Sequence, residues 1–264
     1  MNKVIIPCYQ VDAFTFGPFT GNPAAVCVLA DPLPDDLMQK IAAENNLAET
    51  AFIMPEGDDF QIRWFTPLVE VDLCGHATLA SAFVVLKHLK PETQNVTFNS
   101  PRSGKLYVSL KEEKLELDFP TDKLKKCQLP SIIKESLGSE PLECLTGRSD
   151  YLLLFGSEAE ILALRPDFRK LARADGRGII VTAPGSDVDF VSRFFAPQAG
   201  IDEDPVTGSA HTTLTPFWSA RLGKTSMTAR QLSERGGYLE CTLNGGRTLI
   251  AGRAVLFLKG QIFI

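Results

Sequence analysis

The chain has 264 residues, of which 44% are hydrophobic and 22% charged, and its formal net charge is −5. These values are typical of a globular chain with a full core, held in one large domain or in two of about 130 residues. The negative charge, with no basic run, recognition motif or long apolar segment, argues against partners such as nucleic acid or a membrane.

The first half shows alternating strand and helix patterns. Strands are predicted at residues 4–12, 24–30, 51–55 and 60–67, and a hairpin pattern covers 96–118. Helices are predicted at 31–46, ending at Asn45-Asn46, and at 76–89, directly after Gly75.

A polar, proline-bounded stretch at residues 119–130 marks the predicted boundary between two halves, 1–120 and 121–249. A C-terminal strand at about 250–264 can cross back to complete the first sheet. In the second half, helices are predicted at about 131–137, 157–163, 166–173 and 209–222, and strands near 142–146, 150–155, 178–183, 188–196, 225–231, 237–243 and 247–258. Pro216 lies inside the last helix and is expected to kink or weaken its first turns.

The two halves share one pattern, in which a strand that begins with arginine leads through a glutamate to a glycine and a helix. Arg63, Glu70 and Gly75 mark the first copy. The second copy has its arginine 130 residues later and its glycine 133 residues later, and in both copies the glutamate lies five residues before the glycine. This spacing indicates two halves built on one plan. Because strands dominate and each half has one long apolar helix, we expect an α+β fold in which each half is a curved sheet around its helix. The duplication suggests one site between the halves.

Gly75 and Gly208 each stand directly before a predicted helix. The unpaired N–H groups and the dipole at a helix start attract anions, so the two starts can bind one carboxylated molecule. The alternative is structural, with each glycine a turn residue and Ser209 an N-cap.

Glu49 and His76 are candidate proton-transfer residues. Glu49 precedes an apolar strand, where desolvation raises the pKa of a carboxyl group and suits it to proton transfer; a solvated residue after a helix is the alternative. His76 lies in the first turn of its helix, where the dipole favours the neutral ring. Cys74 precedes that turn and is either a low-pKa thiolate that acts as a nucleophile or base, or a small buried apolar residue.

The run Asp202-Glu203-Asp204 suggests a carboxylate at a helix mouth more than a metal site, because no histidine or cysteine falls at a supporting spacing. No dinucleotide fingerprint, P-loop, nucleophile elbow or zinc-protease motif is present, so no cofactor or metal is expected. The six cysteines are scattered and the N-terminal apolar run ends at Pro7, which predicts free thiols and a cytoplasmic protein.

Five motifs in this order resemble the phenazine-biosynthesis PhzF-like isomerase family, and they span essentially the whole chain. They are Gly21-Asn22-Pro23-Ala24-Ala25-Val26, Asn46-Leu47-Ala48-Glu49-Thr50-Ala51-Phe52, Arg63-Trp64-Phe65-Thr66-Pro67, Cys74-Gly75-His76-Ala77-Thr78 and Asp202-Glu203-Asp204-Pro205-Val206-Thr207-Gly208-Ser209-Ala210-His211.

The resemblance implies a diaminopimelate epimerase-like fold, with two pseudo-symmetric halves, each a barrel-like sheet around a central helix, and the active site in the cleft between them. It also implies a cofactor-independent enzyme that is often a homodimer. The residues that it implies for catalysis are Glu49 as acid/base, with His76 and Asp204 to position and polarise the substrate. Those implied for substrate binding are Asn22, Gly75, Gly208 and Ser209.

Cys74 departs from the phenazine enzyme's pattern and looks like the first thiol of the related epimerases, whose second thiol is missing here because Thr207 takes that place. The sequence therefore predicts an isomerase that moves a proton within a small carboxylated substrate through Glu49. One alternative is a one-sided epimerase, racemase or lyase that uses Cys74. The other is a small-molecule binding protein without turnover.

Overall fold

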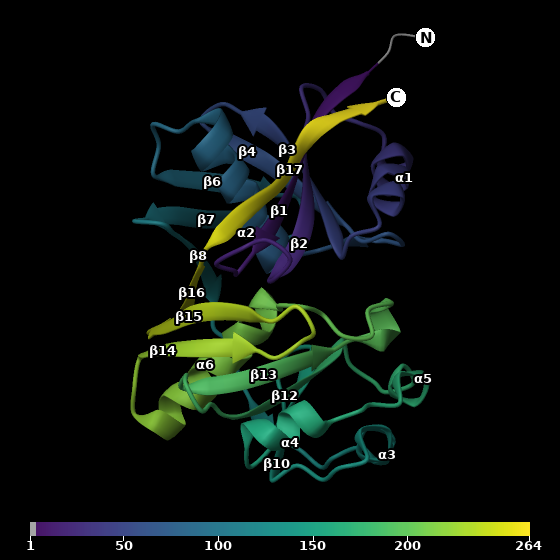
Figure 1. Cartoon of the computed structure of the whole chain (residues 1–264), viewed down its shortest axis with the longest axis vertical. Coiled ribbons are helices and arrows are strands. Elements are labelled where there is room, and N and C mark those ends of the chain that lie inside the picture. Colours follow the sequence, from purple (N-terminus) through teal and green to yellow (C-terminus); the bar gives the residue numbers. More distant parts are fainter. Residues whose placement is uncertain (1–3) are drawn as a thin grey trace. The chain divides into compact units, whose positions relative to one another are not determined.

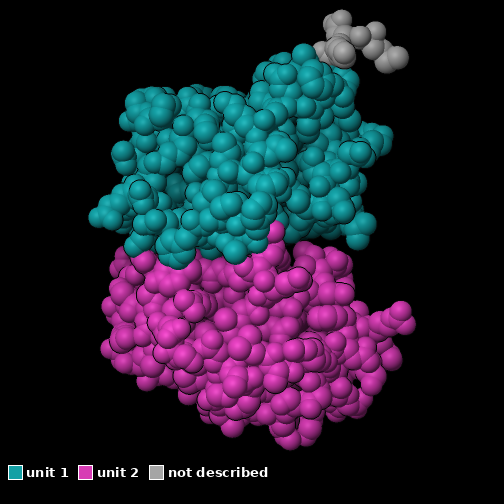
Figure 2. All heavy atoms as spheres, viewed as in Figure 1, with its two compact units in different colours: residues 1–118, 251–264 teal, residues 119–250 magenta. Residues whose placement is uncertain are grey.

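The computed structural model describes residues 4–264, which form two compact units (Figure 1, Figure 2). Unit 1 comprises Met1–Asp118 and Ala251–Ile264, and unit 2 comprises Phe119–Ile250. The chain leaves unit 1 within strand β8 (Lys114–Pro120) and returns to it at the end of strand β16 (Arg247–Gly252). Among the helices of residues 4–264, none is long and apolar enough to span a membrane.

Unit 1 is mainly β-structure with two helices. Its remaining strands are β1 (Ile5–Ala13), β2 (Asn22–Val28), β3 (Glu49–Glu56), β4 (Asp59–Phe65), β5 (Glu70–Val71), β6 (Asn95–Ser100), β7 (Gly104–Lys111) and β17 (Ala254–Phe263). Its helices are α1 (Asp35–Asn45) and α2 (Gly75–Val84), which a π-helical turn, η1 (Val85–Leu89), extends. β17, β1 and β2 pair antiparallel, β2 and β3 pair parallel, β3 and β4 antiparallel, β4 and β6 parallel, and β6, β7 and β8 antiparallel.

Unit 2 repeats this order of pairings. Its remaining strands are β9 (Lys125–Lys126), β10 (Glu143–Thr146), β11 (Asp150–Leu154), β12 (Gly178–Pro184), β13 (Phe190–Phe195), β14 (Ser226–Gln231) and β15 (Gly237–Asn244). Its helices are α3 (Ser131–Leu137), α4 (Glu158–Ala163), α5 (Phe168–Leu171), the 3-10 turn η2 (Pro197–Ala199) and α6 (Gly208–Leu222). β9, β10 and β11 pair antiparallel, β11 and β12 parallel, β12 and β13 antiparallel, β13 and β14 parallel, and β14 and β15 antiparallel. The two halves are therefore built on one plan, as the sequence predicts.

The duplicated arginine and glutamate form the same ion pair in each unit. Arg63 donates through Nε and Nη2 to the Glu70 carboxylate at 2.7 and 2.9 Å, and Arg193 does so to Glu203 at 2.7 and 2.8 Å. Each guanidinium also lies over the phenylalanine ring two residues further along, at 5.2 and 4.9 Å from its centre. A two-point arginine–carboxylate pair fixes direction as well as distance, so it holds the loop between strand and helix in one conformation.

Helices α2 and α1 of unit 1 differ in how much of their surface is buried. Nine of the ten residues of α2 are buried, and it contacts β1, β2, β3 and β17, so it is the central helix of this half (Figure 1). α1 buries only one face, through Met38, Ile41 and Ala42, which pack in a cluster with side chains of β2 and β3 such as Cys27 and Phe52. The sheet of unit 1 is thus covered by helices on both faces.

The central helix of unit 2, α6, continues through Pro216. Proline has no N–H, so the carbonyl four residues earlier, that of Thr212, loses its helical donor. The backbone N–H of Asp122 donates to that carbonyl at 3.2 Å, and the Asp122 carboxylate accepts from Thr213 Oγ1 at 3.0 Å. A segment remote in sequence therefore supplies the hydrogen bond that the helix lacks.

One predicted element is wrong. The apolar pattern over 247–258 predicts a single strand, but β16 and β17 are separate and meet at Arg253. The Arg253 carbonyl accepts from the N–H of Thr15, and a Cβ at Gly252 would lie 2.4 Å from the Phe14 ring. Arg253 is thus the single residue between the two strands, at the point where the chain passes close to the loop that follows β1.

Candidate functional site

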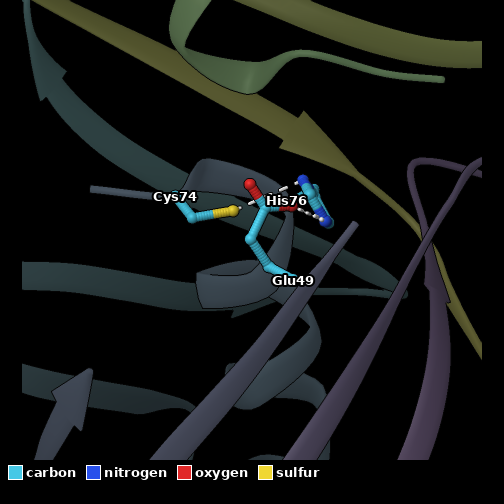
Figure 3. Close-up of side chains that lie close together, drawn as sticks. All are labelled: Glu49, Cys74 and His76. Carbon is cyan, nitrogen blue, oxygen red and sulfur yellow. Dashed lines mark hydrogen bonds and ion pairs between the residues drawn. The ribbon is translucent and has the colours of Figure 1, made fainter. Parts of the chain in front are cut away.

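Three chemically active side chains of unit 1 meet at the start of α2 (Figure 3). Glu49 is the first residue of β3, Cys74 is the N-cap of α2, and His76 is the second residue of that helix. All three are buried, and one donor atom from each lies within 4.8 Å of the others. A carboxylate, a thiol and an imidazole therefore share one small buried volume.

The His76 ring lies in the middle of this cluster. Its Nε2 is 3.3 Å from Glu49 Oε2, and on its other side Nδ1 is 3.1 Å from Asn22 Nδ2 and 3.4 Å from Cys74 Sγ. An amide nitrogen can only donate, so in this arrangement Nδ1 accepts. The proton of the neutral ring is then on Nε2, where it faces the carboxylate of Glu49.

The end of α1 places Glu49. Asn46 has the left-handed conformation (φ 48°, ψ 37°), and its N–H donates to the Ala42 carbonyl, which ends the helix as its asparagine pair predicts. Asn45 Nδ2 donates to Thr50 Oγ1 at 3.1 Å and ties the helix end to the residue after Glu49. Glu49 therefore enters β3 at a fixed point.

Gly21 places Asn22 at the start of β2. It has φ +72°, and a Cβ at this position would lie 2.2 Å from the Ala13 carbonyl oxygen and 2.9 Å from Thr15 Cβ. Only glycine fits this turn, because an added side chain would meet both neighbours in a backbone conformation that L-residues disfavour. Asn22 itself is fully buried, and its amide faces His76.

The loop before Cys74 is held by polar contacts on both sides. Glu70, already paired with Arg63, also accepts from Arg102 at 2.7 Å, and Arg102 in turn donates to Asp72 at 3.0 Å. Thr66 Oγ1 accepts from the N–H of Val69 at 3.0 Å and closes the turn after β4. These contacts fix the position from which Cys74 and His76 enter the helix.

The corresponding site residues of unit 2 lie at the start of α6. Thr207 is the N-cap, and Gly208 and Ser209 are the first two helical residues. The buried Asp204 carboxylate accepts from Thr207 Oγ1 at 2.5 Å, and Gln231 receives the Thr207 N–H at 2.8 Å. Gln231 also donates to the Asp204 carbonyl at 2.7 Å. The sequence does not point to Gln231, because this residue comes from β14 and nothing near it in the chain marks it.

His211 is a second buried histidine with a different environment. Its side chain is fully buried, and its Nδ1–H donates to the Thr207 carbonyl at 2.9 Å. Burial lowers the pKa of His211 to about 4, so the ring is neutral at physiological pH. The neutral His211 ring therefore stabilises the first turn of α6 through its hydrogen bond to the Thr207 carbonyl.

The structure thus brings together the predicted residues Asn22, Glu49, Cys74, Gly75 and His76 in unit 1. Within unit 2 it brings together Asp204, Gly208 and Ser209. Neither the Cys74 nor the Thr207 side chain caps its helix by a hydrogen bond. In each unit the polar residues are arranged around the first turn of a central helix, where backbone N–H groups attract negative charge.

Comparison with known proteins gives consistent matches over almost the whole chain. The family described as "Phenazine biosynthesis-like protein" matches residues 11–260. A protein of Pseudomonas aeruginosa named as an uncharacterized isomerase is 52% identical over 254 residues, which cover 96% of this chain and 97% of that protein. The crystal structure of a PhzF-family phenazine biosynthesis protein from Enterococcus faecalis has a TM-score of 0.95 and 46% identity, and covers 99% of this chain and 100% of that one.

A more distant match concerns the fold alone. The structure of a probable proline racemase from Agrobacterium radiobacter has a TM-score of 0.64 at 13% identity, and covers 97% of this chain and 92% of that one. These matches confirm the predicted fold class, a mixed fold of curled sheet and few helices that PhzF proteins share with such racemases.

Proposed function

This chain belongs to the phenazine biosynthesis-like (PhzF) family and is an isomerase, and we propose that Glu49 moves the proton in its reaction. The substrate that we propose is a small carboxylated molecule, and the reaction uses no cofactor. The observation that carries this proposal is the buried Glu49 carboxylate 3.3 Å from the His76 imidazole, at the start of a central helix.

In the proposed step, Glu49 removes a proton from a substrate carbon and returns it to another. The C–H bond breaks as an O–H bond forms on the carboxylate, and this O–H then breaks as the new C–H forms. The Nε2–H of His76 stabilises the ionised carboxylate that must accept the proton. Asn22 supports this by holding Nδ1 of the same ring, 3.1 Å away, which fixes the tautomer.

The substrate carboxylate is proposed to bind to backbone N–H groups at helix starts. Gly75 opens α2, and Gly208 and Ser209 open α6, so each unit offers donors of the right polarity. Asp204 is proposed to position and polarise the substrate, because it is a buried carboxylate held at the start of α6 by Thr207. Asp204→Asn should then lower turnover.

Deuterium exchange tests the assignment of Glu49. Candidate carboxylic acids are first screened by thermal shift, and those that bind are then incubated with enzyme in D₂O and followed by NMR. Wild-type enzyme should wash deuterium into its ligand, and Glu49→Gln should lose about 10²–10⁴-fold in this rate. Ligand affinity should change little in Glu49→Gln, because glutamine keeps the shape of the side chain and the helix starts bind the carboxylate.

Cys74→Ser is the matched control, and it separates this mechanism from the second candidate. That candidate, a one-sided epimerase, racemase or lyase, rests on the Cys74 sulfur, which lies 3.4 Å from His76 Nδ1 and so has a neighbouring base. If exchange survives in Glu49→Gln and vanishes in Cys74→Ser, the thiol is the base. A chain that binds acids but exchanges no deuterium with any of them would be a binding protein without turnover.

We also propose that the enzyme is a homodimer and works in the cytoplasm. Large apolar side chains of β1 and β17 are exposed, among them Ile5, Phe257, Leu258 and Phe263. A second copy that covers them would remove apolar surface from water. Light scattering should give twice the mass of one chain, and Phe257→Glu should give the single-chain mass; an unchanged mass would contradict this interface. The scattered cysteines, which form no disulfides, support a reducing compartment.

A further inference from the structure

We propose that Glu49, Cys74 and His76 form a binding site for one thiophilic divalent cation, Zn²⁺ above all, which inhibits the enzyme when bound. The residues offer a carboxylate oxygen, a thiolate sulfur and an imidazole nitrogen, one of each kind of ligand that Zn²⁺ prefers. The sequence alone did not predict this set, because Glu49 is 25 residues from Cys74 in the chain and meets it only through the packing of β3 on α2.

One ligand atom from each of the three residues lies close enough to the others for a single tetrahedral ion to reach them after side-chain rotation. Zinc lies about 2.3 Å from sulfur, 2.0–2.1 Å from nitrogen and 2.0–2.2 Å from oxygen, which puts two ligand atoms of one ion roughly 3.3–3.6 Å apart. Nε2 of His76 is 3.3 Å from Glu49 Oε2, within this range. The Cys74 sulfur lies 3.4 Å from the other ring nitrogen, Nδ1, so its side chain must turn toward Nε2 to join them. One donor atom from each residue already lies within 4.8 Å of the others, so small side-chain rotations complete the set.

Asn22 selects the nitrogen that takes the ion. Its amide stands 3.1 Å from Nδ1, which leaves Nε2, the nitrogen beside Glu49, for coordination. A metal-bound histidine donates its other N–H to a carbonyl or carboxylate, which sets the ring's orientation. Rotation of the Asn22 amide presents its oxygen to Nδ1–H and provides that partner.

Charge favours binding of a divalent cation, and the kinds of ligand atom determine which metal binds. A thiolate and a carboxylate together carry two negative charges, which one divalent cation neutralises, so metal binding leaves no net charge in this buried volume. Binding releases the thiol proton to solvent. Sulfur and nitrogen ligands favour Zn²⁺ and Co²⁺ over Mg²⁺ and Ca²⁺.

The acidic run of unit 2 does not offer a comparable site. The Glu203 carboxylate is paired with Arg193, and the Asp204 carboxylate accepts from Thr207. Among the described residues, the cluster at the start of α2 is the one that gathers three donor atoms of metal-binding type.

Cobalt provides a direct readout of binding that needs no substrate. Titration of Co²⁺ into reduced, purified enzyme should give one equivalent of tetrahedral Co²⁺, with visible absorption and a thiolate charge-transfer band in the near ultraviolet. Zn²⁺ should abolish both signals, and Mg²⁺ should not. Cys74→Ser should lose the charge-transfer band, and His76→Gln should lose tetrahedral binding.

The double variant Cys127→Ser/Cys144→Ser is the control, because these two sulfurs lie 3.4 Å apart and are a second candidate for binding metal through thiols. It should keep the wild-type spectrum. A band that persists in Cys74→Ser, or a titration without tetrahedral cobalt, would overturn the proposal.

The proposal that the ion binds does not depend on the proposed function. The proposal that the ion inhibits the enzyme rests on the proposed role of Glu49 as the base. Saturating Zn²⁺ should slow deuterium exchange by at least about 10²-fold, because the ion occupies the proposed base, and a chelator should restore the rate. If the Cys74-dependent cobalt band appears but exchange continues with the ion bound, the metal site stands and the role of Glu49 fails. If exchange depends on Glu49 but no band appears, that role stands and the metal site fails.

Discussion

Acidification should destabilise unit 2 through His211, because the folded protein buries this ring in its neutral form. An unfolded histidine has a pKa of 6.5, and burial lowers that of His211 to about 4. The two values differ by about two to three pKa units, and each unit is worth about 1.4 kcal/mol, so full protonation costs about 3 kcal/mol of folding free energy.

The sign follows from which state binds the proton. Between the two pKa values the unfolded chain binds a proton that the folded chain does not, so the free energy of unfolding falls as the pH falls. This contribution is complete above the unfolded pKa and is lost progressively as the pH drops from 6.5 through about 4. From about pH 7.5 to about pH 4.5 the loss is about 2–3 kcal/mol.

Urea unfolding at several pH values measures this loss, with tryptophan fluorescence as the probe. The chain has two tryptophans, and Trp218 lies in α6, stacked on Phe190, which also contacts the His211 ring. A Trp64→Phe background therefore leaves a fluorescence signal from unit 2 alone. In that background, His211→Gln keeps an N–H donor near the Thr207 carbonyl but cannot titrate.

The comparison is between the pH dependence of the two proteins, since other groups titrate equally in both. The background protein should lose about 2–3 kcal/mol more than its His211→Gln variant over this pH range. Parallel curves, within about 0.5 kcal/mol, would refute the argument that His211 is buried and neutral in the folded state.

Two further changes test how the loops hold the site and the central helix. Gly21→Ala should lower the free energy of unfolding by at least about 1–2 kcal/mol and reduce turnover, because its Cβ would meet the Ala13 carbonyl oxygen at 2.2 Å. Gly57→Ala is its control in urea unfolding, since Gly57 has a similar φ of +62° with nothing within 4 Å of the new Cβ; equal losses would show that the close approach at Gly21 is unimportant. Asp122→Ala should cost about 1–3 kcal/mol by removing the acceptor of Thr213 Oγ1, and an unchanged melting temperature would contradict this.

The sequence by itself determined the repeated plan and the local ends of elements. The spacing of Arg63, Glu70 and Gly75, repeated in the second half, predicted a duplicated strand and helix, and the structure shows the same ion pair in both. Asn46 predicted the end of α1, because asparagine tolerates the left-handed conformation that ends a helix. These features depend on residues close in the chain, so a local pattern is enough to predict them.

Only the tertiary structure decided which side chains meet. Asn22, Glu49 and His76 lie 27 residues apart from one to the next, and they come together because β2 pairs parallel with β3 and α2 packs on both strands. The hydrogen bond that Pro216 cannot make is replaced by Asp122, more than 90 residues away. No local pattern encodes such contacts, because parallel pairing and helix packing join segments whose separation is set by the whole fold.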